Sequence, residues 1–234
     1  MKVTLIVPTL NEIDGMKIIM PRVKKEWYDQ IIIMDGGSTD CTIEYSRKQG
    51  YFIYIQKKKG FRNGYTEILP FIKGEVVLTF SPDGNSIPEL IPNLIKRMEE
   101  GFDMVIASRY LGPAKSQDDD LVTAFGNWLF TKTINFLHGG HYTDAMVIFR
   151  AYKTKMIYDL ELNKDDGYRV AEKLFNTQIS WEPLLSVRAI KRKLKVTEIH
   201  GDEHLRIGGE RKLKIFKWGA AYYFQFWREL FFWR

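Results

Sequence analysis

The sequence of 234 residues predicts an α/β protein with a mainly parallel central sheet and flanking helices. Two observations lead to this fold class. Strand-like and helix-like segments alternate at short, regular spacing up to about residue 107, as right-handed βαβ crossovers require. Acidic and amide side chains directly follow several predicted strands, which is typical of open α/β sheets that bind ligands at their carboxyl edge.

The predicted strands of the first half are short apolar runs rich in β-branched residues. They lie at residues 2–8, 30–34, 51–56, 75–80 and 103–107. Between them, apolar residues recur at helical spacing, and glycines follow several of the helices as stop signals. These helices are predicted at residues 13–28, 39–49, 63–72 and 87–100.

The pattern changes after Tyr110. A polar stretch at residues 112–120 ends in three aspartates and predicts a mobile loop. The remaining predicted elements are helices at 121–137 and 165–176, strands at 146–149 and 194–199, a charged loop at 201–212 and a helix from about 214. Since no linker separates the two halves, we predict one domain, residues 1–212, that divides at about residue 110. An aromatic and basic amphipathic segment, residues 213–234, follows it.

Composition narrows the class of partner. The net charge of +6 predicts an anionic one, such as a nucleotide, a nucleic acid or a membrane surface. The single cysteine, Cys41, excludes an intramolecular disulfide and fits a reducing cytoplasm. Basic residues interleaved with aromatics in residues 213–234 favour membrane-surface docking over duplex binding. Packing onto the domain and an oligomer interface are the alternatives for this segment.

Polar groups follow three of the predicted strands: Pro8 to Glu12, Asp35, and Asp83 with Asn85. Because parallel strands end at the same edge of a sheet, we expect these groups to converge. Asp83 and Asn85 offer oxygen ligands to a hard divalent cation that also binds phosphate, although Pro, Asp, Gly and Asn equally favour a tight turn.

Asp35 can accept hydrogen bonds from a base or a ribose hydroxyl. The alternative is a strand-to-helix turn capped by Ser38 or Thr39. The glycines that follow Asp35 lack the G-x-G-x-x-G spacing of a dinucleotide fingerprint, which argues against a dehydrogenase.

These segments resemble, in order, the signatures of glycosyltransferase family 2, in particular its dolichol-phosphate mannose synthase-like, polyprenyl-phosphate-dependent branch. The matching segments are Pro8–Glu12, Met34–Asp40, Ser81–Asn85, Ala107–Tyr110 (family G-S-R-Y) and Asp144–Tyr152 (family D-x-x-S-G-F-R-A-Y). Together they cover roughly residues 3–153.

The resemblance implies a GT-A fold, a nucleotide half at about 1–110 and an acceptor half at about 111–212. It also implies a nucleotide-diphosphate sugar donor and Mg²⁺ or Mn²⁺ on the diphosphate. The implied donor-site residues are Pro8, Leu10, Glu12, Asp35, Asp83 and Lys212, and the implied metal ligands are Asp83 and Asn85. Arg109 would face the diphosphate or the acceptor phosphate, and Arg150 would lie close to it. The basic loop of Glu203, Arg206 and Lys212 would close over the donor. The alternative is a charged surface loop that leads into the C-terminal helix.

Three departures from the family pattern carry predictions of their own. Ser81 stands where the first metal-site aspartate is expected, which predicts weaker metal binding or coordination through water. Asp118 to Asp120 replace basic residues of the polyprenyl-phosphate branch and would repel an acceptor phosphate. Residues 145–148 lack the family's Ser-Gly, and the sequence has no apolar run of about 18–20 residues that could form the branch's transmembrane helices.

A hydroxyl acceptor requires a general base, whereas an ionised phosphate acceptor does not. Asp144 is the first candidate for this base, and Asp118, Asp119 and Asp120 are alternatives. A helix cap or a partner for Arg150 is the structural alternative for Asp144, and a solvated loop is the alternative for the three aspartates.

The sequence therefore predicts a metal-dependent, inverting hexosyltransferase at the cytoplasmic face of a membrane. It would move a sugar from a UDP- or GDP-linked donor to a lipid-linked or saccharide acceptor. The alternatives are a non-catalytic, membrane-associated scaffold that binds nucleotide sugars, supported by Ser81, and a sugar-phosphate nucleotidyltransferase, whose N-terminal Gly-rich loop is missing. The predicted partners are the donor, the acceptor, a membrane surface and a second copy of the chain, but no nucleic acid.

Overall fold

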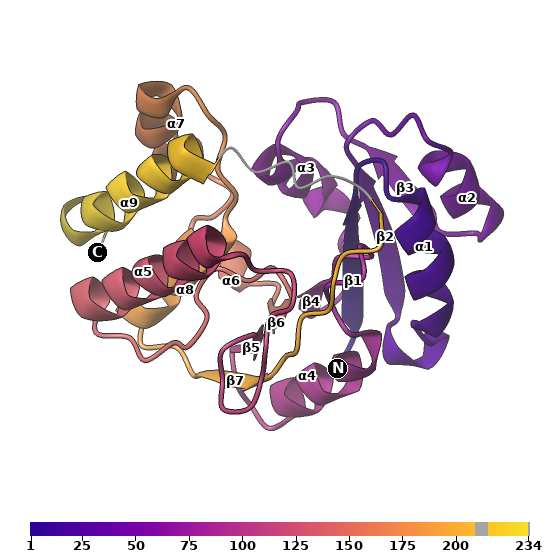
Figure 1. Ribbon diagram of the computed structural model, residues 1–234, viewed down its shortest axis with the longest axis horizontal. Coiled ribbons are helices and arrows are strands. Elements are labelled where there is room, and N and C mark those ends of the chain that lie inside the picture. The colour runs from indigo at the N-terminus through magenta and orange to yellow at the C-terminus, as the bar shows by residue number, and fades with distance from the viewer. Residues whose placement is uncertain (209–214, 234) are drawn as a thin grey trace.

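The computed structural model describes residues 1–208 and 215–233, and the strands of this part of the chain form one twisted sheet (Figure 1). The sheet has seven strands in the order β3-β2-β1-β4-β6-β5-β7. Their bounds are β1 Val3–Thr9, β2 Gln30–Asp35, β3 Phe52–Ile55, β4 Val76–Thr79, β5 Met104–Ser108, β6 Arg150–Lys153 and β7 Val196–His200. The predicted α/β fold class is confirmed.

Most neighbouring strands run parallel, and β6 is the exception because it pairs antiparallel with both β4 and β5. The parallel register sets Thr9 beside Asp35 and Ile6 beside Thr79, so β1, β2 and β4 end at one edge. The predicted strand at 146–149 is wrong in position. The Asp144 carboxylate accepts the amide N–H groups of Met146 and Val147, both at 3.2 Å, which forms a turn and delays the strand to Arg150.

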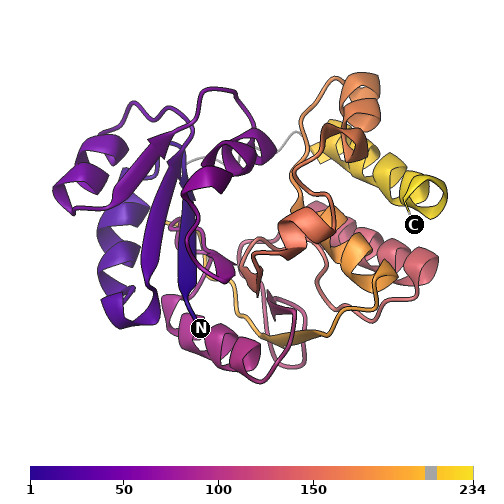
Figure 2. The same ribbon diagram turned by 180° about the vertical axis from the view of Figure 1, so that it is seen from behind.

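Helices cover both faces of the sheet and form a separate group beyond β6 (Figure 2). They are α1 Ile13–Ile19, α2 Thr42–Lys48, α3 Phe61–Ile68, α4 Ile91–Glu99, α5 Leu121–His138, α6 Met156–Asp159, α7 Arg169–Phe175, α8 Glu182–Lys191 and α9 Ile215–Phe232. The predicted helix at 13–28 is too long. The α-helix ends at Ile19 and short 3-10 turns follow it, because Pro21 has no amide N–H to continue the ladder.

Helix α8, which packs against α5 and α9, was not predicted from the sequence. Every residue from Glu182 to Ala189 is buried, so the helix has no polar face and therefore no amphipathic pattern. Its charged residue Arg188 pairs with Glu229 of α9 at 2.8 Å, and both side chains are buried. A buried charge needs such a partner, so this pair ties α9 to the core.

Helix α9 packs against α5, α7 and α8. The rings of Phe130 in α5 and Phe226 in α9 lie 6.0 Å apart, and Phe226 is fully buried. The predicted aromatic helix at the C-terminal end is therefore present, and one of its faces packs onto the domain. None of the described helices combines the length and apolar character that crossing a membrane requires.

The close approach of α1 to the loop after β4 depends on Gly15. A Cβ atom at this position would lie 2.2 Å from the carbonyl oxygen of Pro82. We expect Gly15→Ala to lower the free energy of unfolding by roughly 1–3 kcal/mol, because backbone atoms cannot give way as a flexible side chain can. Chemical denaturation followed by circular dichroism measures this change.

Gly126→Ala is the matched control, since it also replaces a helical glycine but its Cβ would meet only a ring atom of Phe130 at 4.0 Å. Its helix propensity should raise stability by about 0.5–1 kcal/mol. Equal stability of the two variants would contradict the proposed role of the Gly15 contact.

Candidate active site

The carboxyl ends of β1, β2 and β4 open onto a cleft of about 1360 Å³. Its opposite wall comes from α5, α7 and α9 and from the loops that follow β5 and β7. Of the residues predicted from the sequence, those that line the cleft are Pro8, Leu10, Glu12, Asp83, Asn85 and Arg109. The three strand ends therefore converge on the cleft as expected, although Met34 and Gly36, not Asp35, line it at the end of β2.

Asp35, at the end of β2, is fully buried and does not line the cleft. Its carboxylate accepts hydrogen bonds from the Thr9 hydroxyl at 2.7 Å and from the amides of Gly37 and Ser38 at 2.9 and 2.7 Å. The Ser38 hydroxyl donates a further bond at 2.6 Å. Asp35 thus fixes the loop after β2 rather than presenting free oxygens to a nucleoside. These interactions match the turn of the structural alternative but not its cap, because α2 begins at Thr42 and its N-cap position is Cys41 rather than Ser38 or Thr39.

Asp83 and Asn85 lie together in the loop after β4, and both are nearly buried. One Asp83 oxygen accepts the Asn85 amide at 3.1 Å, and the other pairs with the Arg206 guanidinium at 3.0 Å. Arg206 also approaches Glu12 at 3.7 Å, and the Ile207 amide donates to the Asp83 carbonyl at 2.7 Å. The loop after β7 therefore folds over this segment and places a positive charge beside its carboxylate.

The chemistry of these groups fits a divalent metal whose coordination sphere is completed by oxygens from other groups. The Asn85 side-chain oxygen is buried and has no hydrogen-bond partner in the described part of the chain. Together with Asp83 it provides two hard oxygen donors, and Mg²⁺ usually takes one or two carboxylates, substrate phosphates and water. Within residues 1–208 and 215–233, no three His, Cys, Asp or Glu residues gather into a group that could hold a metal by themselves.

Arg109, at the end of β5, forms a bidentate ion pair with Asp144. The two contacts measure 2.6 and 3.1 Å, and Asp144 is fully buried. The guanidinium also lies 3.6 Å from Glu203 and 4.0 Å from Asp119. Burial opposes its charge, but the adjacent Asp144 carboxylate outweighs burial and raises the pKa of Arg109 well above its ordinary value. Arg109 is a permanent cation in the wall of the cleft.

Asp144 was predicted as a general base, and its surroundings are unsuited to proton transfer. Burial disfavours its charge, but Arg109 more than offsets this and lowers the pKa of the carboxyl. Its oxygens also accept the amides of Met146 and Val147. Asp144 is an ion-pair partner, as the structural alternative predicted, but its partner is Arg109 and not Arg150.

Arg150 is fully buried and does not line the cleft. It donates to the carbonyls of Ala145 and Val147 at 3.2 and 2.8 Å and to the Ser186 hydroxyl at 2.9 Å. Its position beneath residues 145–148 shapes that part of the cleft floor. The resemblance implied a place close to Arg109 and the phosphate, and the structure puts Arg150 behind residues 145–148 and outside the cleft lining.

The loop of residues 112–120 is not freely solvated. It pairs with the loop after β7 through Gln117 N–H to the Glu203 carbonyl at 2.8 Å and Glu203 N–H to the Lys115 carbonyl at 2.9 Å. Asp119 is buried against Tyr110 and Asn127, and Asp120 caps α5 by accepting the Thr123 amide at 2.7 Å. The solvated-loop alternative is therefore wrong for Asp119, whose side chain is buried, whereas Asp120 caps α5 from an exposed position.

Glu203 is the site residue whose chemistry the sequence did not reveal. It lines the cleft, accepts a hydrogen bond from Ser116 and lies 3.6 Å from Arg109. Burial raises the pKa of Glu203, and the nearby Arg109 only partly counteracts this. No local signal marks it, because its burial arises from the pairing of two distant loops. Lys212, the remaining predicted donor residue, lies outside the described residues.

The raised pKa of Glu203 gives a pH-dependent prediction. A carboxyl whose pKa is higher when folded contributes stability that is present below its unfolded pKa, near 4.5, and lost as pH rises through the folded value. Glu203→Gln removes this titration. The variant should therefore gain stability relative to wild type between pH 4 and pH 7, as measured by urea unfolding at both pH values. A stability difference that does not change with pH would contradict the burial of the charge.

The chain belongs to a known family. The model described as "Glycosyl transferase family 2" matches residues 4–161, more than half of the chain. The protein is accordingly a glycosyltransferase with a GT-A fold. This membership favours the transferase interpretation over the scaffold and nucleotidyltransferase alternatives.

Individual relatives agree with this class. The chain is 27% identical over 192 residues to a dolichyl-phosphate hexose transferase of Haloferax volcanii, covering 82% of this chain and 77% of the relative. It is 25% identical over 224 residues to a dolichol-phosphate mannosyltransferase of Pyrococcus furiosus, covering 92% of this chain but only 60% of that protein.

The fold is similar to a crystal structure of glucosyl-3-phosphoglycerate synthase from Mycobacterium tuberculosis in complex with Mn²⁺, UDP and phosphoglyceric acid. The TM-score is 0.65 at 16% identity, and the match covers 95% of this chain and 75% of the other.

Proposed function

We propose that the protein transfers a sugar, with inversion, from a UDP- or GDP-linked donor to a polyprenyl phosphate held in a membrane. The observation that carries this proposal is one continuous cleft with two chemically different ends. Asp83 and Asn85 lie at the sheet end, and residues of α5 and α9 line the other. Arg109 lines the cleft too, where its charge can bind phosphate oxygens.

A phosphate acceptor accounts for the site better than a hydroxyl acceptor. An ionised phosphate attacks without a general base, and Asp144 is held by Arg109 with a lowered pKa. The names of the two dolichyl-phosphate transferases point the same way. Cations from the helical side, Arg169 and Lys173, also line the cleft. In this proposal Asp144 is a positioning residue that orients Arg109, and Asp35 positions the loop after β2.

A divalent metal fits the donor end. Asp83 and Asn85 would hold it together with the donor diphosphate, and when bound it would neutralise charge on the leaving nucleotide. Arg206 now pairs with the Asp83 oxygen that a metal would use. We propose that Arg206 keeps Asp83 paired before the donor binds and then contributes its charge to the diphosphate. Lys212 is proposed to act from the same loop.

Calorimetric titration of UDP and GDP, each with Mn²⁺ or with chelator, tests the donor site. We expect one nucleotide to bind, at least about tenfold more tightly with Mn²⁺ than with chelator. Asp83→Ala should remove this metal dependence because it deletes the carboxylate ligand.

Asp159→Ala, an exposed position on α6, is the matched control and should bind as wild type does. Unchanged metal-dependent binding by Asp83→Ala would refute the metal role of Asp83. Failure of the wild type to bind either nucleotide would refute the proposed donor class.

Arg206→Gln separates the two proposed roles of this side chain. Nucleotide affinity in chelator should fall about tenfold, because a charged hydrogen bond to phosphate is lost. Affinity for Mn²⁺ alone should rise, because Asp83 no longer has a competing cation. The same titrations measure both quantities.

Arg22→Gln serves as the control, since Arg22 pairs with Glu89 on the surface at 2.8 Å and should affect neither affinity. If Arg206→Gln left both affinities unchanged, Arg206 would be a structural partner of Asp83 alone.

A further inference from the structure

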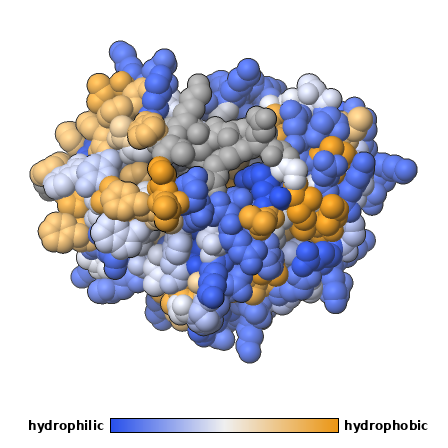
Figure 3. Space-filling model, viewed as in Figure 1, coloured by the Kyte–Doolittle hydropathy of each residue, from blue (hydrophilic) through white to orange (hydrophobic). Residues whose placement is uncertain are grey.

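Helices α5 and α9 lie side by side (Figures 1 and 2). Both helices expose large apolar side chains. The exposed residues are Leu121, Val122, Phe125, Trp128 and Phe136 from α5 and Phe216, Trp227 and Phe231 from α9, which we call the docking face. Leu121, Phe136 and Phe216 are each more than four-fifths exposed. Figure 3 shows apolar side chains gathered on the part of the molecule formed by α5, α7 and α9. A soluble surface rarely carries so many large apolar groups together.

The exposed apolar residues of α5 and those of α9 lie on either side of the contact between the two helices. Phe130 of α5 packs against Tyr222 and Phe226 of α9, with ring centroids 6.5 and 6.0 Å apart. The hydroxyls of Thr133 and Tyr223 lie 3.5 Å apart across the same contact. The interior sides of both helices are therefore used for packing. Their outer sides face away from the core and have no element of the described chain over them.

Within α5 and α9 themselves the exposed charged residues are positive, although the exposed Asp120 directly precedes α5. Helix α5 contains no Asp or Glu, and the single acid of α9, Glu229, is fully buried against Arg188. Lys132 and Lys217 are exposed on these two helices. Lysines among exposed aromatic and aliphatic residues are typical of a surface that lies at the interface of a bilayer with anionic lipids.

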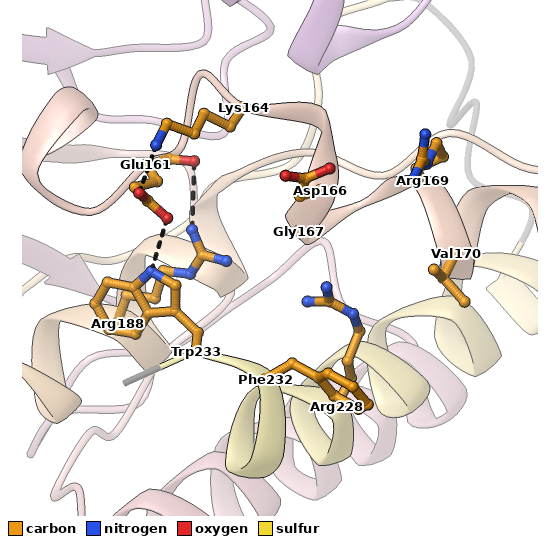
Figure 4. Close-up of a pocket in the computed structure, with 10 residues that line it drawn as sticks. All are labelled: Glu161, Lys164, Asp166, Gly167, Arg169, Val170, Arg188, Arg228, Phe232 and Trp233. Atoms are coloured by element: carbon orange, nitrogen blue, oxygen red, sulfur yellow. Dashed lines mark hydrogen bonds and ion pairs between the residues drawn. The ribbon is translucent and has the colours of Figure 1, made fainter.

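Further cations lie at the edge of the docking face. Figure 4 shows a smaller pocket of about 270 Å³ between α7 and the end of α9. Arg169, Arg228 and Lys164 line it beside the exposed ring of Phe232, together with Glu161 and Asp166. Lys164 pairs with Glu161 and Arg228 with Glu229, so this pocket has mixed charge. The charge complementarity to anionic headgroups therefore rests on Lys132 and Lys217.

The opposite sides of the same two helices form part of the cleft. Thr123 and Asn127 of α5 and Trp218 and Tyr222 of α9 line it. One helix pair thus presents its outer side to a surface and its inner side to the reaction site.

We propose that α5 and α9 together form a membrane-docking face that binds bilayers containing anionic lipids. Docking through α5 goes beyond a C-terminal anchor, because half of the face belongs to a helix in the middle of the chain. The proposal rests on the proposed function for the lipid-borne acceptor, whereas docking itself is measured without donor or acceptor.

Sedimentation of the full chain with phosphatidylcholine vesicles, with or without 30% phosphatidylglycerol, tests the proposal. The wild type should bind the anionic vesicles and bind neutral ones more weakly. Phe125→Glu/Phe136→Glu in α5 should lower the partition coefficient at least about tenfold, because two charges enter the apolar interface. Lys132→Glu should lower it at least about fivefold, since each basic residue near an anionic surface contributes about 1 kcal/mol and the substitution also adds a negative charge.

Two exposed positions in the other half of the chain are matched controls: Ile18→Glu on α1 and Lys48→Glu on α2, which should bind vesicles as the wild type does. Unchanged binding by the α5 variants would overturn the proposal, and so would loss of binding only with Trp227→Glu. A wild-type dimer in light scattering that Phe136→Glu dissociates, without vesicle binding, would assign the face to a second copy and also overturn it.

Nucleotide titration of Phe125→Glu/Phe136→Glu distinguishes this proposal from the proposed function. Docking that fails while the nucleotide still binds overturns only the membrane face. Docking that succeeds in a protein that binds neither nucleotide overturns only the donor site.

Discussion

The acceptor half of the site depends on the buried ion pair between Arg109 and Asp144. It joins the end of β5 to the loop before β6, and Glu198 of β7 accepts the amides of Thr143 and Asp144, at 2.8 and 3.0 Å. Removing one partner of such a pair leaves an uncompensated buried charge and typically costs about 3–5 kcal/mol. Because Glu203 and Asp119 approach the same guanidinium, one cation organises three loops from separate parts of the chain.

The donor half is organised in the opposite way, around an anion. Asp83 is held by the turn to Asn85, by the Arg206 guanidinium and by the close packing of Gly15 against Pro82. Ser81 leaves this segment with one carboxylate fewer than the family pattern, and a guanidinium balances the carboxylate that remains. In the proposed mechanism, metal binding is therefore coupled to release of the Arg206–Asp83 ion pair, since both would use the Asp83 carboxylate.

The sequence predicted those parts of the fold that depend on residues close together in the chain. The five strands of the first half have β-branched runs with clear stops, so their positions follow from periodicity and turn chemistry. Helix α8 was not predicted because it is buried on all sides and so has no amphipathic pattern. The strand predicted at 146–149 begins only at Arg150, because the Asp144 carboxylate accepts the amides of Met146 and Val147. The cleft-lining positions of Pro8, Glu12, Asp83, Asn85 and Arg109 follow from their place at strand ends, which the parallel register enforces.

The sequence by itself determined the family, the α/β order of elements and which strand ends carry polar chemistry. These properties reside in contiguous segments, where spacing and residue type act locally. Only the tertiary structure decided how charges are paired: Asp144 with Arg109, Arg206 with Asp83, and Arg188 with Glu229. It also decided that α5 shares an exposed apolar face with α9. Such pairings join residues far apart in the chain, and burial, which sets their strength and their pKa values, exists only once the chain has folded.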